Sequence, residues 1–150
     1  MARFSVRVAA PLADVYEYLA EPTNRPEWQS SLRSVDLLTD GPLRVGTAWI
    51  DRTAAGVNPR MEIIGLVPPG EDGDEPVTWS EAGEWRGIRA MLTLTFEPAE
   101  DDPGATCVWV VADILTGPLW LLPVRSVLRM LAPAAVRSDL RRAARIIESR

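Results

Sequence analysis

Few residues of this chain combine a reactive side chain with a predicted position inside the fold. Arg52 and Arg60 bracket a predicted turn, and either guanidinium could hold a carboxylate through two parallel hydrogen bonds. Tyr16 lies on the predicted buried face of a helix and Tyr18 does not, so Tyr16 is the candidate hydrogen-bonding group. Asp113 is the one acid in an apolar strand. A desolvated carboxyl there could act as a base, although strand alternation favours an outward-facing surface acid.

The residue types that are missing exclude several kinds of catalysis. The 150-residue chain has no His, and all sixteen of its basic residues are Arg. These absences exclude His-dependent triads, His-based zinc sites, Schiff-base catalysis and a Walker A lysine. Cys107 is the single cysteine, so no internal disulfide is expected, which fits a cytoplasmic location. No metal or cofactor is expected, because the chain shows no calcium-loop or phosphate-loop pattern.

The composition is that of one soluble globular domain over residues 1–150, with 47% hydrophobic and 25% charged residues. The formal net charge of −5 argues against general nucleic-acid binding. Only a C-terminal stripe of Arg137, Arg141, Arg142 and Arg145 leaves a role as an RNA- or protein-interaction module open. The most apolar stretch, 114–122, is about half as long as a membrane-spanning helix, so membrane insertion is not expected.

Hydrophobic periodicity predicts the elements that must position these side chains. Alternating apolar residues predict strands at 3–9, 32–39, 46–53, 60–67, 77–81, 86–97 and 106–115. Helical spacing predicts helices at 11–20 and 24–29, and a long C-terminal helix from residue 133. A run of strands with helices at both ends predicts an α+β fold, with the helices on one face of an antiparallel sheet.

Small residues on two neighbouring strands predict a cavity between that sheet and the C-terminal helix. Ala90 and Leu92 should face the helix, and Val110, Ala112 and Ile114 should point the same way from the next strand. Alanines on a concave face leave room for a ligand. The alternative is that the long helix fills this space and leaves an ordinary packed core.

The six tryptophans are too many for all of them to be deep core, because a buried indole N–H needs a partner. Trp28 ends the second helix and should lie near the mouth of the cavity. Trp49 and Trp79 either form a flat wall for a ring-shaped ligand or pack as ordinary core. Trp109 points outward, where an exposed apolar patch is consistent with a homodimer contact.

Three segments resemble the polyketide cyclase/dehydrase-like branch of the START and birch-pollen-allergen superfamily, also called SRPBCC. They are the strand leading into Ala10–Leu19, the segment Glu21–Trp28 with its closing tryptophan, and the glycine-bearing hairpin Thr39–Trp49. The resemblance covers the whole chain. It implies a helix-grip fold, in which a curved antiparallel sheet of about seven strands wraps around the C-terminal helix and two short helices follow the first strand.

The same resemblance implies a deep, mostly apolar cavity that binds lipids, sterols, polyketides, hormones or quinones. We therefore expect a carrier or sensor of a small hydrophobic molecule. The alternative is a cyclase or dehydratase of polyketide-like substrates, in which Arg52, Arg60 and Tyr16 anchor the substrate. The residues expected at the cavity are Tyr16, Trp28, Trp49, Arg52, Arg60, Met61, Ile63, Trp79, Ala90, Leu92, Leu94, Val110, Ala112 and Ile114.

Overall fold

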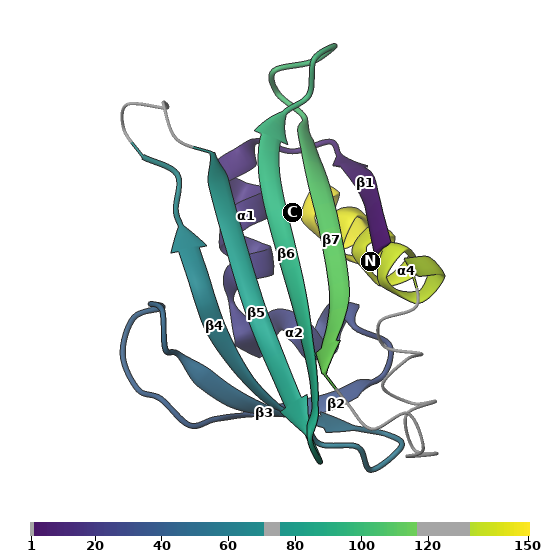
Figure 1. Cartoon of the computed structure of the whole chain (residues 1–150). Helices are drawn as coiled ribbons and strands as arrows, with labels where there is room; N and C mark the ends of the chain where they lie inside the picture. Colours follow the sequence, from purple (N-terminus) through teal and green to yellow (C-terminus); the bar gives the residue numbers. More distant parts are fainter. Residues whose placement is uncertain (1, 71–75, 117–132) are drawn as a thin grey trace.

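The computed structural model describes residues 2–70, 76–116 and 133–150. Seven strands form one antiparallel sheet in the order β1-β7-β6-β5-β4-β3-β2, so the first and last strands of the chain lie side by side (Figure 1). The strands are β1 (Ala2–Val8), β2 (Leu32–Leu37), β3 (Ala48–Thr53), β4 (Arg60–Val67), β5 (Val77–Trp85), β6 (Ile88–Pro98) and β7 (Thr106–Thr116). The helix-grip fold and all seven predicted strands are confirmed; residues 117–122 of the apolar stretch lie outside the described residues.

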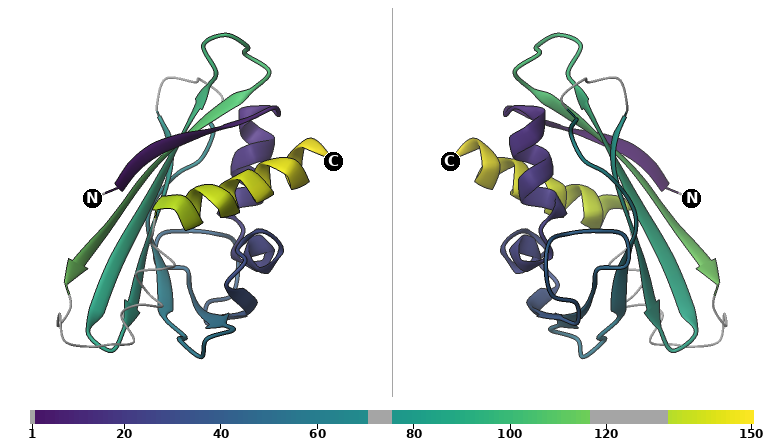
Figure 2. Two further views of the ribbon diagram at one scale, coloured as in Figure 1. Left: turned by 90° about the vertical axis from the view of Figure 1, so that its right-hand side faces the viewer. Right: turned by 90° about the vertical axis from the view of Figure 1, so that its left-hand side faces the viewer.

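The helices cover a single face of this curved sheet (Figure 2). The chain forms α1 (Leu12–Ala20), the short 3-10 helix η1 (Pro22–Asn24), α2 (Arg25–Trp28) and α4 (Pro133–Glu148). α4 buries the predicted apolar stripe of Val136, Leu140, Ala143 and Ile147 against the sheet, and its arginines stay at the surface. Among the described residues, no helix combines the length and apolar character needed to cross a membrane.

Two expectations about local structure were wrong. β5 continues to Trp85 instead of ending at residue 81, because Ala82, Gly83 and Glu84 keep their pairing with β6. On α1, Tyr18 is buried, with 3% of its surface exposed, whereas Tyr16 is only half-buried. Tyr18 is covered by Arg150, whose guanidinium lies 4.7 Å from the centre of the ring, and its hydroxyl donates to Glu27. Arg150, just beyond the end of α4, therefore covers a face of α1 that helical spacing alone leaves exposed.

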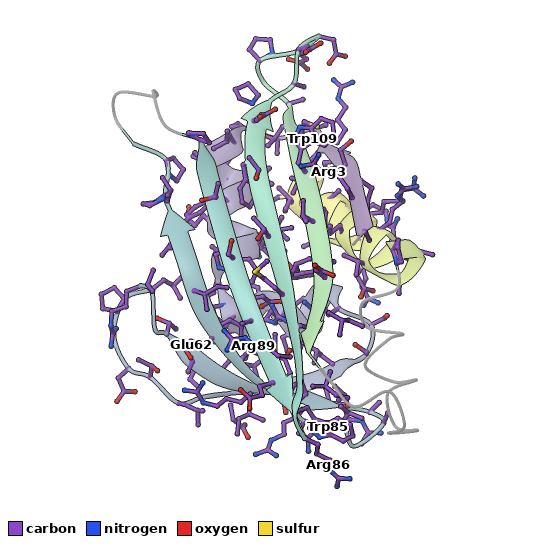
Figure 3. The ribbon with its side chains drawn as sticks, in the orientation of Figure 1. Arg3, Glu62, Trp85, Arg86, Arg89 and Trp109 are labelled. Carbon is purple, nitrogen blue, oxygen red and sulfur yellow. The ribbon has the colours of Figure 1, made fainter. Side chains whose placement is uncertain are left out.

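The β5–β6 hairpin closes through a two-residue turn in which both residues have positive φ, 49° at Arg86 and 82° at Gly87. This is the conformation of a type I′ turn, which favours Asn-Gly. The Arg86 guanidinium lies over the Trp85 ring, 5.0 Å from its centre (Figure 3).

We expect Arg86→Asn to raise the free energy of unfolding by roughly 1 kcal/mol, because Asn adopts the left-handed region at less cost than Arg. Urea unfolding of the variant beside wild type measures the difference. A less stable variant would show that the contact between Arg86 and Trp85 outweighs the backbone strain.

Candidate functional site

A small pocket lies between the inner face of the sheet and the helices α2 and α4. The sheet supplies Met61 from β4, Glu81 and Gly83 from β5, and Ala90 and Leu92 from β6. On the helical side, the wall consists of Arg25, Trp28, Val136, Asp139 and Leu140. Trp85 and Ile88, at the β5–β6 hairpin, add to the apolar part of the lining, as do Pro59 and Met91. The walls are thus mostly apolar, with three charged side chains among them.

The pocket encloses about 80 Å³, far less than the deep cavity that the resemblance implies. Typical sites for small molecules hold roughly 300–1,000 Å³. Bulky side chains such as Trp28, Met61 and Leu140 occupy much of the space between sheet and helix. The Met61 sulfur lies against the backbone of Gly83, where a Cβ would come within 2.8 Å of it. The glycine therefore makes room for the Met61 side chain.

A second hollow, an open groove of about 610 Å³, lies between α1 and the C-terminal end of α4. Its walls carry Asp14, Glu17, Glu21, Glu148 and Arg150, most of which are exposed to solvent. Ligand sites combine apolar walls with a few convergent polar groups, a description that fits the smaller pocket and not this groove.

A buried ionic cluster adjoins the smaller pocket, whose wall includes Arg25 and Glu81. One Arg25 nitrogen donates to the Glu81 carboxylate at 2.7 Å and another donates to Asp51 at 3.0 Å. Only 2% of the Arg25 surface is exposed, and Asp51 is fully buried. The indole N–H of Trp49 donates to the other Asp51 oxygen at 2.9 Å, and the Trp49 ring lies 5.3 Å from the guanidinium. α2, β3 and β5 are therefore held together by one cation and two acids.

Burial and charge shift the pKa of several of these groups. Burial raises the pKa of Glu81 to about 7, helped by the Asp51 charge and opposed by Arg25. Burial alone would lower the pKa of Arg25, but the two carboxylates more than offset this effect and raise it. Asp139 on α4 has a raised pKa because it is partly buried, although it accepts hydrogen bonds from the Ser30 N–H and hydroxyl. Glu81 thus lies in the pocket wall as a carboxyl able to hold or release a proton near neutrality.

Three buried N–H groups of the described residues have no hydrogen-bond partner: Arg25 Nε, Trp28 Nε1 and Trp79 Nε1. Arg25 and Trp28 both line the pocket, whereas Trp79 is packed in the core away from it. Buried polar groups without partners are uncommon in folded proteins, and a bound molecule is one way to satisfy them. Two residues of α2 that line the pocket therefore carry N–H donors without a partner in the described part of the chain.

Of the residues expected at the cavity, the structure brings Trp28, Met61, Ala90 and Leu92 together at the pocket. Ile114 pairs with Ala90 and shares its face, but it lies at the end of β7 and is 39% exposed. Tyr16 packs edge-on against Phe96, with the ring centres 5.5 Å apart. The others belong to the packed core and do not line the pocket: Trp49, Ile63, Trp79, Leu94, Val110 and Ala112.

The two arginines expected to anchor a carboxylate lie outside the pocket. Arg52 donates to Asp36 at 2.7 Å and Arg60 donates to Glu62 at 3.0 Å, and all four side chains are substantially exposed. Figure 3 shows Glu62 on the outer face of the sheet, opposite the helices. Strand alternation turns Arg52 and Arg60 away from the helices, because Asp51 and Met61 occupy the inward positions beside them.

The charged residues that do line the pocket, Arg25, Glu81 and Asp139, were missed from the sequence. Strand alternation carried a signal for Glu81, because Val77 and Trp79 precede it on one face and that face is apolar. The same reasoning places Asp51 beside Trp49 on the inward face of β3. Arg25 gave no such signal, since its burial depends on α2 packing over the sheet.

A curved antiparallel sheet covered by a C-terminal helix, with a pocket between them, defines the helix-grip class. The chain belongs to the polyketide cyclase/dehydrase and lipid transport family, whose model matches residues 1–150. No curated protein matches the chain.

Solved structures of the same fold cover nearly the whole chain. A Deinococcus radiodurans protein is 21% identical over 99% of this chain and 97% of its own, with a TM-score of 0.64. A Thermus thermophilus protein is 19% identical over 99% and 97%, with a TM-score of 0.68. A hypothetical protein from Helicobacter pylori is 12% identical over 96% and 85%, with a TM-score of 0.73. At these identities the likeness establishes the fold alone.

Proposed function

We propose that this domain binds a small, largely apolar molecule in the pocket between the sheet and α4 and acts as a carrier or sensor. The observation that carries the proposal is the wall itself, in which Met61, Ala90, Leu92 and Leu140 surround the space. Trp28, whose indole N–H has no partner among the described residues, also lines it. Membership of a family of cyclases, dehydrases and lipid-transport proteins supports the same class of ligand.

The small volume of the pocket sets the size of what it can hold without rearrangement. An apolar hollow of about 150 Å³ is enough for a benzene ring, so 80 Å³ holds part of one ring. The Met61 side chain is unbranched and rests against Gly83, so a change of rotamer would enlarge the space. We therefore propose a ligand of one or two rings, or an end of a longer molecule, bound with Met61 displaced.

We expect Ala90→Leu to weaken binding at least tenfold while leaving the melting temperature unchanged or raised, because leucine fills the pocket that the ligand would occupy. Thermal-shift and native mass-spectrometry screens against lipids, quinones and aromatic polyketides supply the ligand and measure its affinity. Arg89→Leu is the matched control, because it adds the same side chain to the neighbouring outward-facing position. If both variants bind like wild type, the ligand does not occupy this pocket.

The second candidate is an enzyme, because Glu81 and Arg25 meet at the pocket wall. In a dehydration, the Glu81 carboxylate would take a proton from the carbon beside a ketone, and the hydroxyl on the next carbon would leave as water with that proton. Arg52, Arg60 and Tyr16 are not proposed again for this role, because they do not line the pocket.

The enzyme candidate predicts that the protein converts 3-hydroxy-1-phenylpropan-1-one to phenyl vinyl ketone and water, followed by absorbance. Glu81→Gln should lower the rate at least a hundredfold, the usual contribution of a general acid–base. Glu62→Gln, an exposed carboxylate on the outer face, is the control and should keep the rate. If the ketone binds but is not converted, the enzyme candidate is wrong and the carrier or sensor function is the one proposal left.

A cytoplasmic location and a homodimer remain predictions. Trp109 is 42% exposed on the outer face and donates to Glu97, so it stays available for such a contact (Figure 3).

A further inference from the structure

Two residues that line the pocket have buried N–H donors without a partner among the described residues. Trp28 is 97% buried, and its indole N–H has no partner within the residues that the structure describes. Arg25, one turn earlier on α2, has three hydrogen-bonded partners, yet its Nε–H is also free. An N–H donor buried without a partner costs stability, so a ligand that supplies an acceptor at this place gains a hydrogen bond at little cost.

The charged residues described at the pocket leave no positive charge to spare for an anion. Arg25 is shared between Asp51 and Glu81, so these three groups carry no net positive charge whether Glu81 is protonated or not. Asp139 adds a further acid from α4. A ligand carboxylate would enter a mostly apolar space lined by two acids, and its charge would be desolvated without compensation.

We propose that the pocket selects uncharged molecules that carry a hydrogen-bond acceptor, such as aryl ketones, whose oxygen accepts from Trp28 Nε1, and that it rejects free carboxylates. This inference rests on the proposed function and adds the chemical class of the ligand. We therefore expect fatty acids and aromatic acids to be poor ligands, although their apolar parts suit the apolar walls of the pocket.

Three probes of nearly equal size separate the contribution of a hydrogen bond to binding from those of apolar contact and of charge. Acetophenone carries a neutral acceptor, ethylbenzene carries none, and benzoate carries a charged one. We would titrate each at pH 8 into protein labelled at the tryptophan indole nitrogens and at the methionine methyl groups, and follow both by NMR. The Met61 methyl, assigned with Met61→Leu, reports entry into the pocket. The Trp28 indole proton reports the hydrogen bond, and the equally unpaired Trp79 indole, outside the pocket, is the internal control.

Acetophenone is expected to shift the Met61 methyl and to move the Trp28 indole proton downfield, with no effect on Trp79. Ethylbenzene should shift Met61 alone and bind roughly three- to tenfold more weakly, the usual net value of one neutral hydrogen bond. Benzoate should bind more weakly still. In Trp28→Phe, which keeps a ring but loses the N–H, acetophenone and ethylbenzene should bind equally, whereas Trp79→Phe should keep the preference.

The outcomes distinguish this inference from the proposed function. If all three probes shift Met61 with equal affinity, or if benzoate binds best, the pocket binds ligands and the selectivity is wrong. If acetophenone shifts Met61 but leaves the Trp28 proton in place, a water already serves that donor and the anchoring role is wrong. If no probe shifts Met61, the pocket does not admit a ring, and the proposed function fails together with the inference.

Discussion

Replacing Arg25 with alanine is expected to lower the free energy of unfolding by about 3–5 kcal/mol, the usual cost of removing one partner from a buried ion pair. Among the described residues, the Arg25 guanidinium is the one cation paired with Asp51 and Glu81, at 3.0 and 2.7 Å, and all three side chains are almost fully buried. Without it, the two carboxyl groups would face each other in a buried place with no cation between them. Urea unfolding at pH 7, followed by tryptophan fluorescence, measures the loss.

The matched control is Arg52→Ala, which breaks an ion pair of the same type at the surface. Arg52 and Asp36 are about half exposed and 2.7 Å apart. Exposed pairs contribute about 0–1 kcal/mol, so this variant should unfold almost like wild type. Equal effects of the two substitutions would show that the Arg25 cluster is solvated, contrary to the buried arrangement described above.

The stability of the protein should fall as pH rises from about 4.5 to about 7, and Glu81→Gln should remove this part of the pH dependence. The pKa of Glu81 is about 7 in the folded protein and near its ordinary value of 4.5 when unfolded. Between these values the folded state holds a proton that the unfolded state has released. The stabilisation from Glu81 is therefore complete below pH 4.5 and lost through pH 7, a change of about 3 kcal/mol.

Glutamine is a suitable replacement because its amide oxygen can still accept a hydrogen bond from Arg25. Arg25 also keeps its ion pair with Asp51 in this variant. Above pH 7 the variant should match or exceed wild type in stability. Asp139→Asn, tested in parallel, measures the contribution of Asp139, the other carboxyl in the pocket wall whose pKa is raised. Parallel pH profiles of wild type and Glu81→Gln between pH 4.5 and 8 would contradict the raised pKa of Glu81.

The sequence was enough to predict the fold because each element carries its own periodic pattern. β6 alternates over eleven residues, and the apolar stripe of α4 recurs at helical spacing, so both could be placed without tertiary information. The inward positions of Ala90 and Leu92 followed from the same alternation, and both lie at the pocket. Trp28, which ends the short helix α2, also lines the pocket.

The polar part of the site could not be predicted in this way because it is created by packing between distant segments. Arg25 and Glu81 are 56 residues apart, and their contact exists only once α2 lies over β5. Arg52 and Arg60 looked suitable as isolated arginines near a turn, but each has an exposed acidic neighbour across or along the sheet. The size of the pocket could not be predicted either, because it depends on how the Met61 and Leu140 side chains fill the space beside Gly83 and Ala90.

The most direct test of ligand binding in this pocket is a high-resolution crystal structure of protein taken from its expression host without removal of bound small molecules. We expect continuous electron density for an organic molecule between Trp28, Ala90 and Leu140, with a polar atom within hydrogen-bond distance of Trp28 Nε1. A pocket that holds only a few ordered waters, in protein that no lipid, quinone or aromatic ketone stabilises, would contradict it.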